Sequence, residues 1–420
     1  MCRIILNGQR YATMNSRQKQ PVEVKHLRGF KYFKRIDALL NHLHNSNNDP
    51  KRELHFDQYA SLLLFYFFNG IITSMRGLQK VTDFDKVRKK LGISHASLGS
   101  LSEASHVFDS DGLREIFLSL STEASAADGI PRPPGLDQRL ALTAVDGSVL
   151  DALPRMVWAL WLDETRRAAK LHLDFDILKG IPVGADITTA SGVDSSETYH
   201  VKQTLEPNRL YVMDRGYAEY ELLQSIMTAG SSFLCRLRQN TVYETVEERV
   251  VSEAARKAGV EYDRIVRLGS PMRRDAIRDT VRLVKIIVTN EESCSLGPRK
   301  SRVSSKHTYR TNSDVHEILL ATDQLGLSSE DVGLMYRHRW QIELFFKWLK
   351  CVLGCRHWIA ESKNGVELQV YAALIASLLI VLWTGKKPTK RTFEMIQFYL
   401  LGWVSEKEMD RHLSSLKPAV

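Results

Sequence analysis

One stretch in the C-terminal third of the chain spaces four polar side chains at helical intervals. Tyr336, Arg339, Glu343 and Lys350 are separated by 3, 4 and 7 residues, so at about 100° per residue they fall within roughly 60° of one another around a helix. These four side chains therefore form one polar stripe beside an apolar face, at the edge of the core rather than in open solvent. An amphipathic helix with an incidental Glu343–Lys350 surface pair produces the same periodicity.

Two further carboxylates follow apolar runs that are typical of strands. Asp146 follows residues 142–145, and Asp214 follows residues 210–213. We therefore expect each acid at the C-terminal end of its strand, which is the edge where sites form in open α/β sheets and where two carboxylates can share a hard cation. Taken singly, an aspartate at such a place is more often a turn residue.

The spacing of the four helix residues resembles the Tyr-Arg-Glu-Lys signature of DDE transposases of the insertion-sequence-four family, and all four positions match. Asp146 within Val-Asp-Gly-Ser and Asp214 within Val-Met-Asp-Arg-Gly-Tyr resemble that family's first two acidic blocks, in the same order. The resemblance covers residues 137–360 well and the N-terminal segment more loosely.

This resemblance implies a ribonuclease H-like core in which two Mg²⁺ ions, replaceable by Mn²⁺, are bound by three catalytic carboxylates: Asp146, Asp214 and Glu343. Two such ions activate a water or 3′-hydroxyl and stabilise the leaving oxygen of an in-line displacement at phosphorus. The resemblance assigns the other residues of the stripe to the DNA phosphates near the cleavage point: Tyr336, Arg339 and Lys350. It also implies double-stranded DNA as partner, both the element's terminal repeats and the target, and a homodimer in the synaptic complex.

Some members of this family resolve a DNA hairpin by flipping a base against a tryptophan of an inserted segment. Residues 240–313 contain no tryptophan. Tyr243, Tyr262 or Tyr309 could take its place by stacking, and the sequence does not choose among them. Use of a hairpin therefore stays open.

The elements that must position these residues follow an α/β pattern with one meander edge. Strands are expected over residues 140–145, 168–177, 182–189, 209–213, 231–237, 242–251, 280–289 and 317–322. Helices are expected over 197–205 and 218–229 and from about residue 329, the last packing an apolar face on the sheet through Met335, Ile342, Phe346, Leu349 and Leu353. Residues 54–80 predict a buried helix, a turn at Gly70 and a second helix.

Three regions follow from this pattern. We expect a helical N-terminal DNA-binding domain over residues 1–125, ending in a linker rich in Ser, Ala, Gly and Pro at 121–137. The ribonuclease H-like catalytic domain is expected over 137–360, with a β-rich insertion at 240–313. A helical C-terminal region is expected over 361–420.

The net charge of +9 is unevenly distributed, because residues 1–52 contain eleven Lys or Arg against three acids, leaving +8. A basic block favours a polyanionic partner, since each neutralised phosphate releases counterions, although a solvated basic surface has the same composition. The same two interpretations apply to the five basic residues at 299–310.

Five scattered cysteines do not form a disulfide framework, which fits a reducing cytoplasm. The family resemblance implies a bacterial protein that associates with the nucleoid when it acts. The longest uncharged apolar run, residues 370–383, has about 14 residues, fewer than the roughly 20 that a membrane-spanning helix needs. We expect a core helix there and no membrane partner.

Together these features predict a transposase that binds the ends of its element, cleaves them and joins the 3′ ends to target DNA in cut-and-paste transposition. A related metal-dependent nuclease without strand transfer would share the fold and the metals. A non-catalytic DNA-binding derivative is disfavoured by the complete acidic triad, because binding alone needs no metal carboxylates.

Overall fold

The computed structural model describes residues 39–44, 52–126, 130–153, 156–161, 167–189, 197–270, 277–289, 315–354 and 357–416. Most of the basic block at residues 1–52 and all of the basic window at 299–310 lie outside these ranges, as does Tyr309. Their roles stay predictions.

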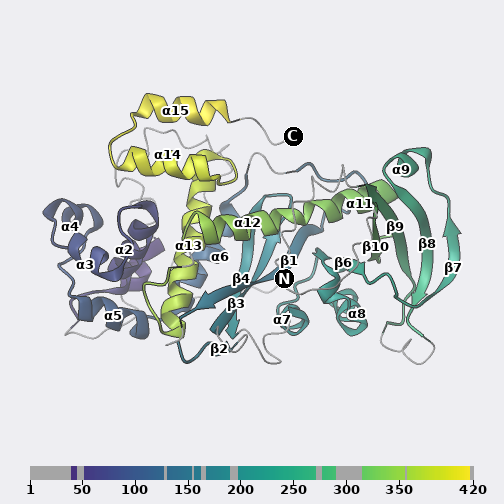
Figure 1. Ribbon diagram of the computed structural model, residues 1–420, viewed down its shortest axis with the longest axis horizontal. Coiled ribbons are helices and arrows are strands. Elements are labelled where there is room, and N and C mark those ends of the chain that lie inside the picture. Colours follow the sequence, from purple (N-terminus) through teal and green to yellow (C-terminus); the bar gives the residue numbers. More distant parts are fainter. Residues whose placement is uncertain are drawn as a thin grey trace, which may run out of the picture.

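Within the described residues, ten strands form one mixed sheet in the order β2-β3-β1-β5-β6-β10-β9-β8-β7, with β4 also paired to β3 (Figure 1). The strands are β1 (Ala141–Ala152), β2 (Leu160–Trp161), β3 (Arg167–Asp176), β4 (Ile181–Thr189), β5 (Arg209–Met213), β6 (Ser232–Leu237), β7 (Tyr243–Arg249), β8 (Val260–Leu268), β9 (Val281–Thr289) and β10 (Val315–Thr322). The eight expected strands are confirmed, and β2 and β8 are additions to them.

The centre of the sheet is parallel and its two sides are antiparallel. β5 pairs in parallel with β1 on one side and with β6 on the other, whereas β1, β3 and β4 form the expected antiparallel meander. Four of the five residues of β5 are buried, because helices cover both faces of a central parallel strand. The protein is therefore a mixed α/β structure.

Two layers of helices enclose this sheet. On one face lie α7 (Glu197–Gln203) and α8 (Tyr220–Thr228), whose apolar residues share a core with Val145, Tyr211 and Met213. On the other face α11 (Ser329–His338) and α12 (Trp340–Cys351) run almost in line across the sheet (Figure 1). Their core includes Ala144 and Val212.

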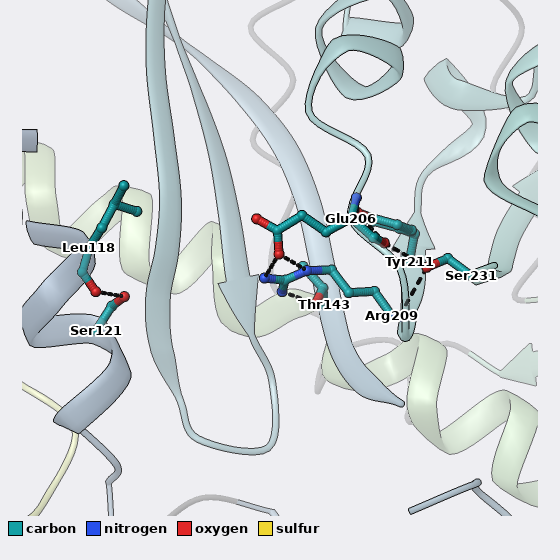
Figure 2. A network of polar contacts seen from close by, with 7 residues as sticks. All are labelled: Leu118, Ser121, Thr143, Glu206, Arg209, Tyr211 and Ser231. Carbon is teal, nitrogen blue, oxygen red and sulfur yellow. Dashed lines mark hydrogen bonds and ion pairs between the residues drawn. The ribbon is translucent and has the colours of Figure 1, made fainter. Parts of the chain in front are cut away.

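A polar network at the start of β5 fixes the register of the three central strands. The guanidinium of Arg209 donates to Thr143 Oγ1 on β1 at 3.0 Å and to Glu206 Oε2 at 2.9 Å (Figure 2). The Arg209 backbone N–H donates to Ser231 Oγ at 3.0 Å, and that hydroxyl donates to the Glu206 carbonyl at 2.7 Å. Side chains of β1 and of the residue before β6 thus converge on one arginine.

The segment expected as an insertion extends the same sheet. Its strands β7, β8 and β9 form an antiparallel ribbon that joins the core because β9 pairs with β10 along its whole length. A short helix, α9 (Glu253–Lys257), connects β7 to β8. The ribbon therefore belongs to the same sheet as the central strands.

The N-terminal helices share a core with the C-terminal region. They are α2 (Phe56–Phe68), α3 (Met75–Val81), α4 (Asp85–Leu91), α5 (Leu98–Val107) and α6 (Ser110–Glu123), and the buried helix, turn and second helix expected at 54–80 are confirmed. The long α13 (Lys363–Thr384) packs against α2, α5, α6 and β4 (Figure 1). The chain ends in α14 (Lys390–Leu400) and α15 (Glu406–Ser415).

By length and composition alone α13 could cross a membrane, but 89% of its most apolar window is buried inside the protein. The expected core helix is confirmed, and it extends to 22 residues because its polar groups find partners. Asn364 Nδ2 donates to the Phe108 carbonyl at 2.6 Å, and the fully buried Gln369 side chain pairs with the backbone of Ile359 and His357.

One buried ion pair joins the β-ribbon to the start of α11. Arg282 on β9 and Asp263 on β8 are only 1% and 3% exposed, and they form two hydrogen bonds of 2.9 and 2.6 Å. Arg282 Nη1 also donates to the Leu327 carbonyl at 2.6 Å, just before α11.

We expect Arg282→Met to destabilise the protein by about 3–5 kcal/mol, because it leaves the Asp263 carboxylate buried and unpaired. Thermal and denaturant unfolding would measure this loss. The double variant Arg282→Met/Asp263→Leu should recover part of it, since the unpaired charge is gone. Lys257→Met, which breaks an exposed pair with Glu253, should change little. A double variant no more stable than the single one would contradict the desolvation argument.

Candidate active site

The polar stripe predicted on one helix lies on two helices that meet at Arg339. The expectation of a single continuous helix is wrong at this residue, which ends α11 and precedes α12. Its φ of −52° and ψ of −31° remain helical, but the N–H of Arg339 bonds the Tyr336 carbonyl and the N–H of Ile342 bonds that of Arg339. Because these tighter i to i+3 bonds continue the helical path through the junction, the four side chains of the stripe stay on one side of the two helices. The apolar face predicted beside it is buried, as expected.

Asp146 lies in the middle of β1, so its expected place at the strand's end is wrong. The reason is that β1 continues to Ala152 by pairing with β3, where Asp146 is opposite Leu173. The parallel pairing of β1 with β5, however, stops at Ala144. Asp146 is thus two residues past the last parallel pair.

Asp214 directly follows β5, as predicted, and caps a short 3₁₀ helix, η3 (Arg215–Tyr217). Its Oδ1 accepts from the Arg215 N–H at 2.7 Å. Ala144 pairs with Val212 on β5, so Asp214 is also two residues past that pair. Because side chains alternate along a strand, both acids face the side of the sheet on which α11 and α12 lie.

Arg339 joins Glu343 to this pair of acids. Its Nη2 lies 2.5 Å from Glu343 Oε1, and its Nη1 lies 3.6 Å from Asp146 Oδ2. The side chain is largely buried between helix and sheet. The guanidinium therefore bridges a carboxylate on β1 and one on α12.

Asp214 has its own partners, Tyr336 and Arg236. The Tyr336 hydroxyl donates to Asp214 Oδ1 at 3.2 Å, and Arg236 Nη1 lies 3.8 Å from the same oxygen. Burial alone would raise the pKa of Asp214, but the Arg215 N–H and the charges of Arg339 and Arg236 outweigh it and lower that pKa. Burial raises the pKa of Tyr336 to about 12, so its hydroxyl stays a donor near neutral pH.

Sequence reasoning did not find Arg236. Val212 of β5 pairs with Leu234 of β6, so Arg236 continues the row of Asp146 and Asp214 on the third strand. The feature that could have identified it is a charged residue within the apolar strand β6, where Arg236 is the one partly exposed position.

Lys350 is turned toward β1. Its Nζ donates to Ser148 Oγ at 2.7 Å and also to the Val149 carbonyl. Ser148 lies two residues beyond Asp146, on the same side of the sheet. The last residue of the predicted stripe therefore lies beside the same strand as the first acid.

The three acids carry hard oxygen donors of the kind that Mg²⁺ and Mn²⁺ prefer. Their side chains are 23%, 29% and 33% exposed for Asp146, Asp214 and Glu343, so solvent ions can reach them. In the described part of the chain, no three His, Cys, Asp or Glu side chains are already arranged to hold a metal ion. The donor set suits a divalent cation chemically, and Arg339 bridges two of its members.

Comparison with known proteins shows which family the chain resembles. The family model for the transposase DDE domain matches residues 139–379. A putative transposase for insertion sequence element IS4SA from Synechocystis is 23% identical over 87% of this chain and 93% of its own length. A putative transposase, y4zB, from Sinorhizobium fredii is 25% identical over 65% of this chain and 69% of its own.

A probable transposase for insertion sequence element IS5377 from Geobacillus stearothermophilus is 24% identical over 58% of this chain and 56% of its own. A cryo-EM structure of a piggyBac transposase synaptic complex aligns with 94% of this chain and 83% of its own, at 11% identity and a TM-score of 0.39, too low to establish a common fold. The family match covers more than half of the chain and contains all six predicted site residues, so this protein belongs to the DDE transposases, of the insertion-sequence-four type that its Tyr-Arg-Glu-Lys spacing predicts.

Proposed function

We propose that this transposase cleaves DNA at the ends of an insertion sequence and joins the 3′ ends to target DNA in cut-and-paste transposition. The observation that carries the proposal is the row formed by Asp146, Asp214 and Arg236 at matching positions of three adjacent parallel strands. Arg339 links this row to Glu343 from the facing helix.

A ribonuclease H-like core is the architecture that we infer for this site. Three features support it: an antiparallel meander of β1, β3 and β4, parallel β5 and β6 on its other side, and acids on β1, after β5 and on a helix packed over them. Within this core, β7 to β9 correspond to the β-rich insertion expected at 240–313.

In the proposed mechanism Asp146, Asp214 and Glu343 would hold two Mg²⁺ ions, with Mn²⁺ as a substitute. When bound, these ions supply Lewis-acid stabilisation of the attacking and leaving oxygens. The oxygen of a water, or later of a 3′-hydroxyl, loses its proton to solvent and forms a bond to phosphorus while the opposite P–O bond breaks in line. The departing oxygen takes up a proton from solvent.

The cationic and phenolic side chains around the acids orient the phosphate. Arg339 and Arg236 offer guanidinium forks, and Lys350 offers a point charge beside β1. The Tyr336 hydroxyl, now bonded to Asp214, is a further donor to a phosphate oxygen. Each holds the scissile strand without binding a metal ion.

The remaining regions are assigned by the same proposal. Residues 1–125 bind the terminal repeats, with the basic block contacting phosphates, residues 137–360 carry the chemistry, and residues 361–420 support both through α13. Two copies form the synaptic complex, because two element ends must be cut and joined together. The reaction takes place on the nucleoid in the bacterial cytoplasm.

The acidic residues give the first test. Asp146→Asn, Asp214→Asn and Glu343→Gln should each abolish Mg²⁺-dependent nicking of a duplex that carries the element's end, while binding in a mobility-shift assay persists, because phosphate contacts elsewhere hold the DNA. Asp331→Asn on α11 is the matched control and should cleave normally. Normal nicking by any of the three variants removes that residue from the site. Absence of joined product in the wild type would instead favour the related nuclease.

Arg236 gives a second test, specific to the row across the strands. Arg236→Gln should slow single-turnover nicking by roughly 10- to 100-fold, since a hydrogen bond to a charged group contributes about 1.5–3 kcal/mol. Arg238→Gln, two residues on and exposed, is the control for the removal of a positive charge. Equal effects of the two substitutions would show that Arg236 acts only through general electrostatics.

The basic N-terminal block gives a third test, in the full chain. Lys31→Gln/Lys34→Gln/Arg35→Gln should weaken duplex binding and reduce the slope of log affinity against log salt by about 0.9 for each phosphate that is no longer neutralised. A triple variant of the same charge at Lys390, Lys407 and Arg411, on α14 and α15, is the control. Identical slopes for the two triple variants would place end binding elsewhere.

A further inference from the structure

Arg339 occupies the position of a cation between two acids. Its two terminal nitrogens contact one oxygen of Glu343, at 2.5 Å, and one of Asp146, at 3.6 Å. Asp146 and Glu343 are two of the three carboxylates that would hold divalent ions in the proposed site. Arg339 is 8% exposed, so solvent screens these contacts only weakly.

The charge balance of the site explains why an arginine lies there. Asp146, Asp214 and Glu343 are three like charges facing the same space, and their repulsion must be offset by cations. Arg236 approaches Asp214, whereas Arg339 approaches both of the others. Arg339 stays charged near neutral pH, because a guanidinium is effectively always protonated in proteins.

The hydrogen bonding of Arg339 is nevertheless incomplete. Its Nε is buried and has no hydrogen-bond partner among the residues that the structure describes. A buried unpaired donor costs on the order of 1–3 kcal/mol. A phosphate group, with several acceptor oxygens, satisfies a guanidinium more fully than one oxygen from each of two carboxylates.

A guanidinium and a divalent ion cannot share these oxygens, because two cations so close together repel one another strongly. Building on the function proposed above, we propose that Arg339 is an exchangeable counterion. It neutralises Asp146 and Glu343 until divalent ions bind, and it then transfers to a phosphate of the DNA. Metal binding and DNA binding are thereby coupled, since each favours the same movement of one side chain.

The position of Arg339 in the chain suits this exchange. It lies at the junction of α11 and α12, where i to i+3 bonds replace the regular helical ladder. The Tyr336 ring lies 5.7 Å from its guanidinium carbon, which provides an aromatic face for the cation near the site. The transfer from the carboxylates to a phosphate requires only a movement of the Arg339 side chain.

Mn²⁺ binding to the full-length protein without DNA tests the exchange, using calorimetry as a readout independent of activity. Arg339→Gln should bind Mn²⁺ roughly 5-fold or more tightly than the wild type, because the competing cation is gone. Lys347→Gln, which removes an exposed charge from α12, should bind as the wild type does. Glu343→Gln should bind more weakly than the wild type.

The reverse measurement uses a blunt duplex of arbitrary sequence at constant ionic strength. Mn²⁺ should tighten the binding of the wild type to this duplex, and Arg339→Gln should lose most of that gain. Absence of any Mn²⁺ effect on the wild type overturns the exchange even if Arg339→Gln does not fold.

The outcomes separate this inference from the proposed function. If Glu343→Gln binds Mn²⁺ as well as the wild type, the proposed metal site itself is wrong. If Glu343→Gln binds more weakly but Arg339→Gln binds no more tightly than the wild type, the site stands and the exchange is overturned.

Discussion

Electrostatic repulsion among Asp146, Asp214 and Glu343 is the constraint on which the arrangement of this protein depends. Carboxylates from a strand, a strand end and a helix can face one another only if cations lie between them and the backbone holds them in place. Arg339 and Arg236 supply the cations. The apolar face of α12 is buried against the sheet and keeps Glu343 in place, because apolar burial is the largest stabilising contribution to folding.

The ribbon of β7 to β9 also helps to hold the site, although it lies at the far end of the sheet. Arg282 on β9 bonds the carbonyl of Leu327, and Ser252 bonds Glu330 Oε1 at the first turn of α11. Both contacts fix the beginning of the helix that carries Tyr336. The segment that sequence patterns describe as an insertion is thus bonded to α11, the first of the two helices that carry the candidate site residues.

What the sequence predicted well was local. Strand β5 and helix α8 follow from apolar periodicity, and the stripe from Tyr336 to Lys350 follows from helix geometry, because both depend on near neighbours in the chain. The predicted end of β1 was wrong because the extension of this strand past Asp146 requires β3 as a partner. Strand β8 was missed because its charged residues obscure the alternation of apolar and polar side chains. Arg236 escaped notice for a similar reason, since its neighbour Asp214 belongs to the adjacent strand and only the folded chain brings them together.

Convergence of the site therefore depends on sheet register more than on the motif itself. Ala144, Val212 and Leu234 form one row across the three parallel strands, and Asp146, Asp214 and Arg236 form the next row on the same face. A slip of one residue would turn Asp146 toward α7 and α8, because side chains alternate with a period of two. Arg209, which bonds Thr143 on β1 and Ser231 before β6, opposes that slip from the other end of the strands. A residue outside the motif thus sets where the motif's first acid points.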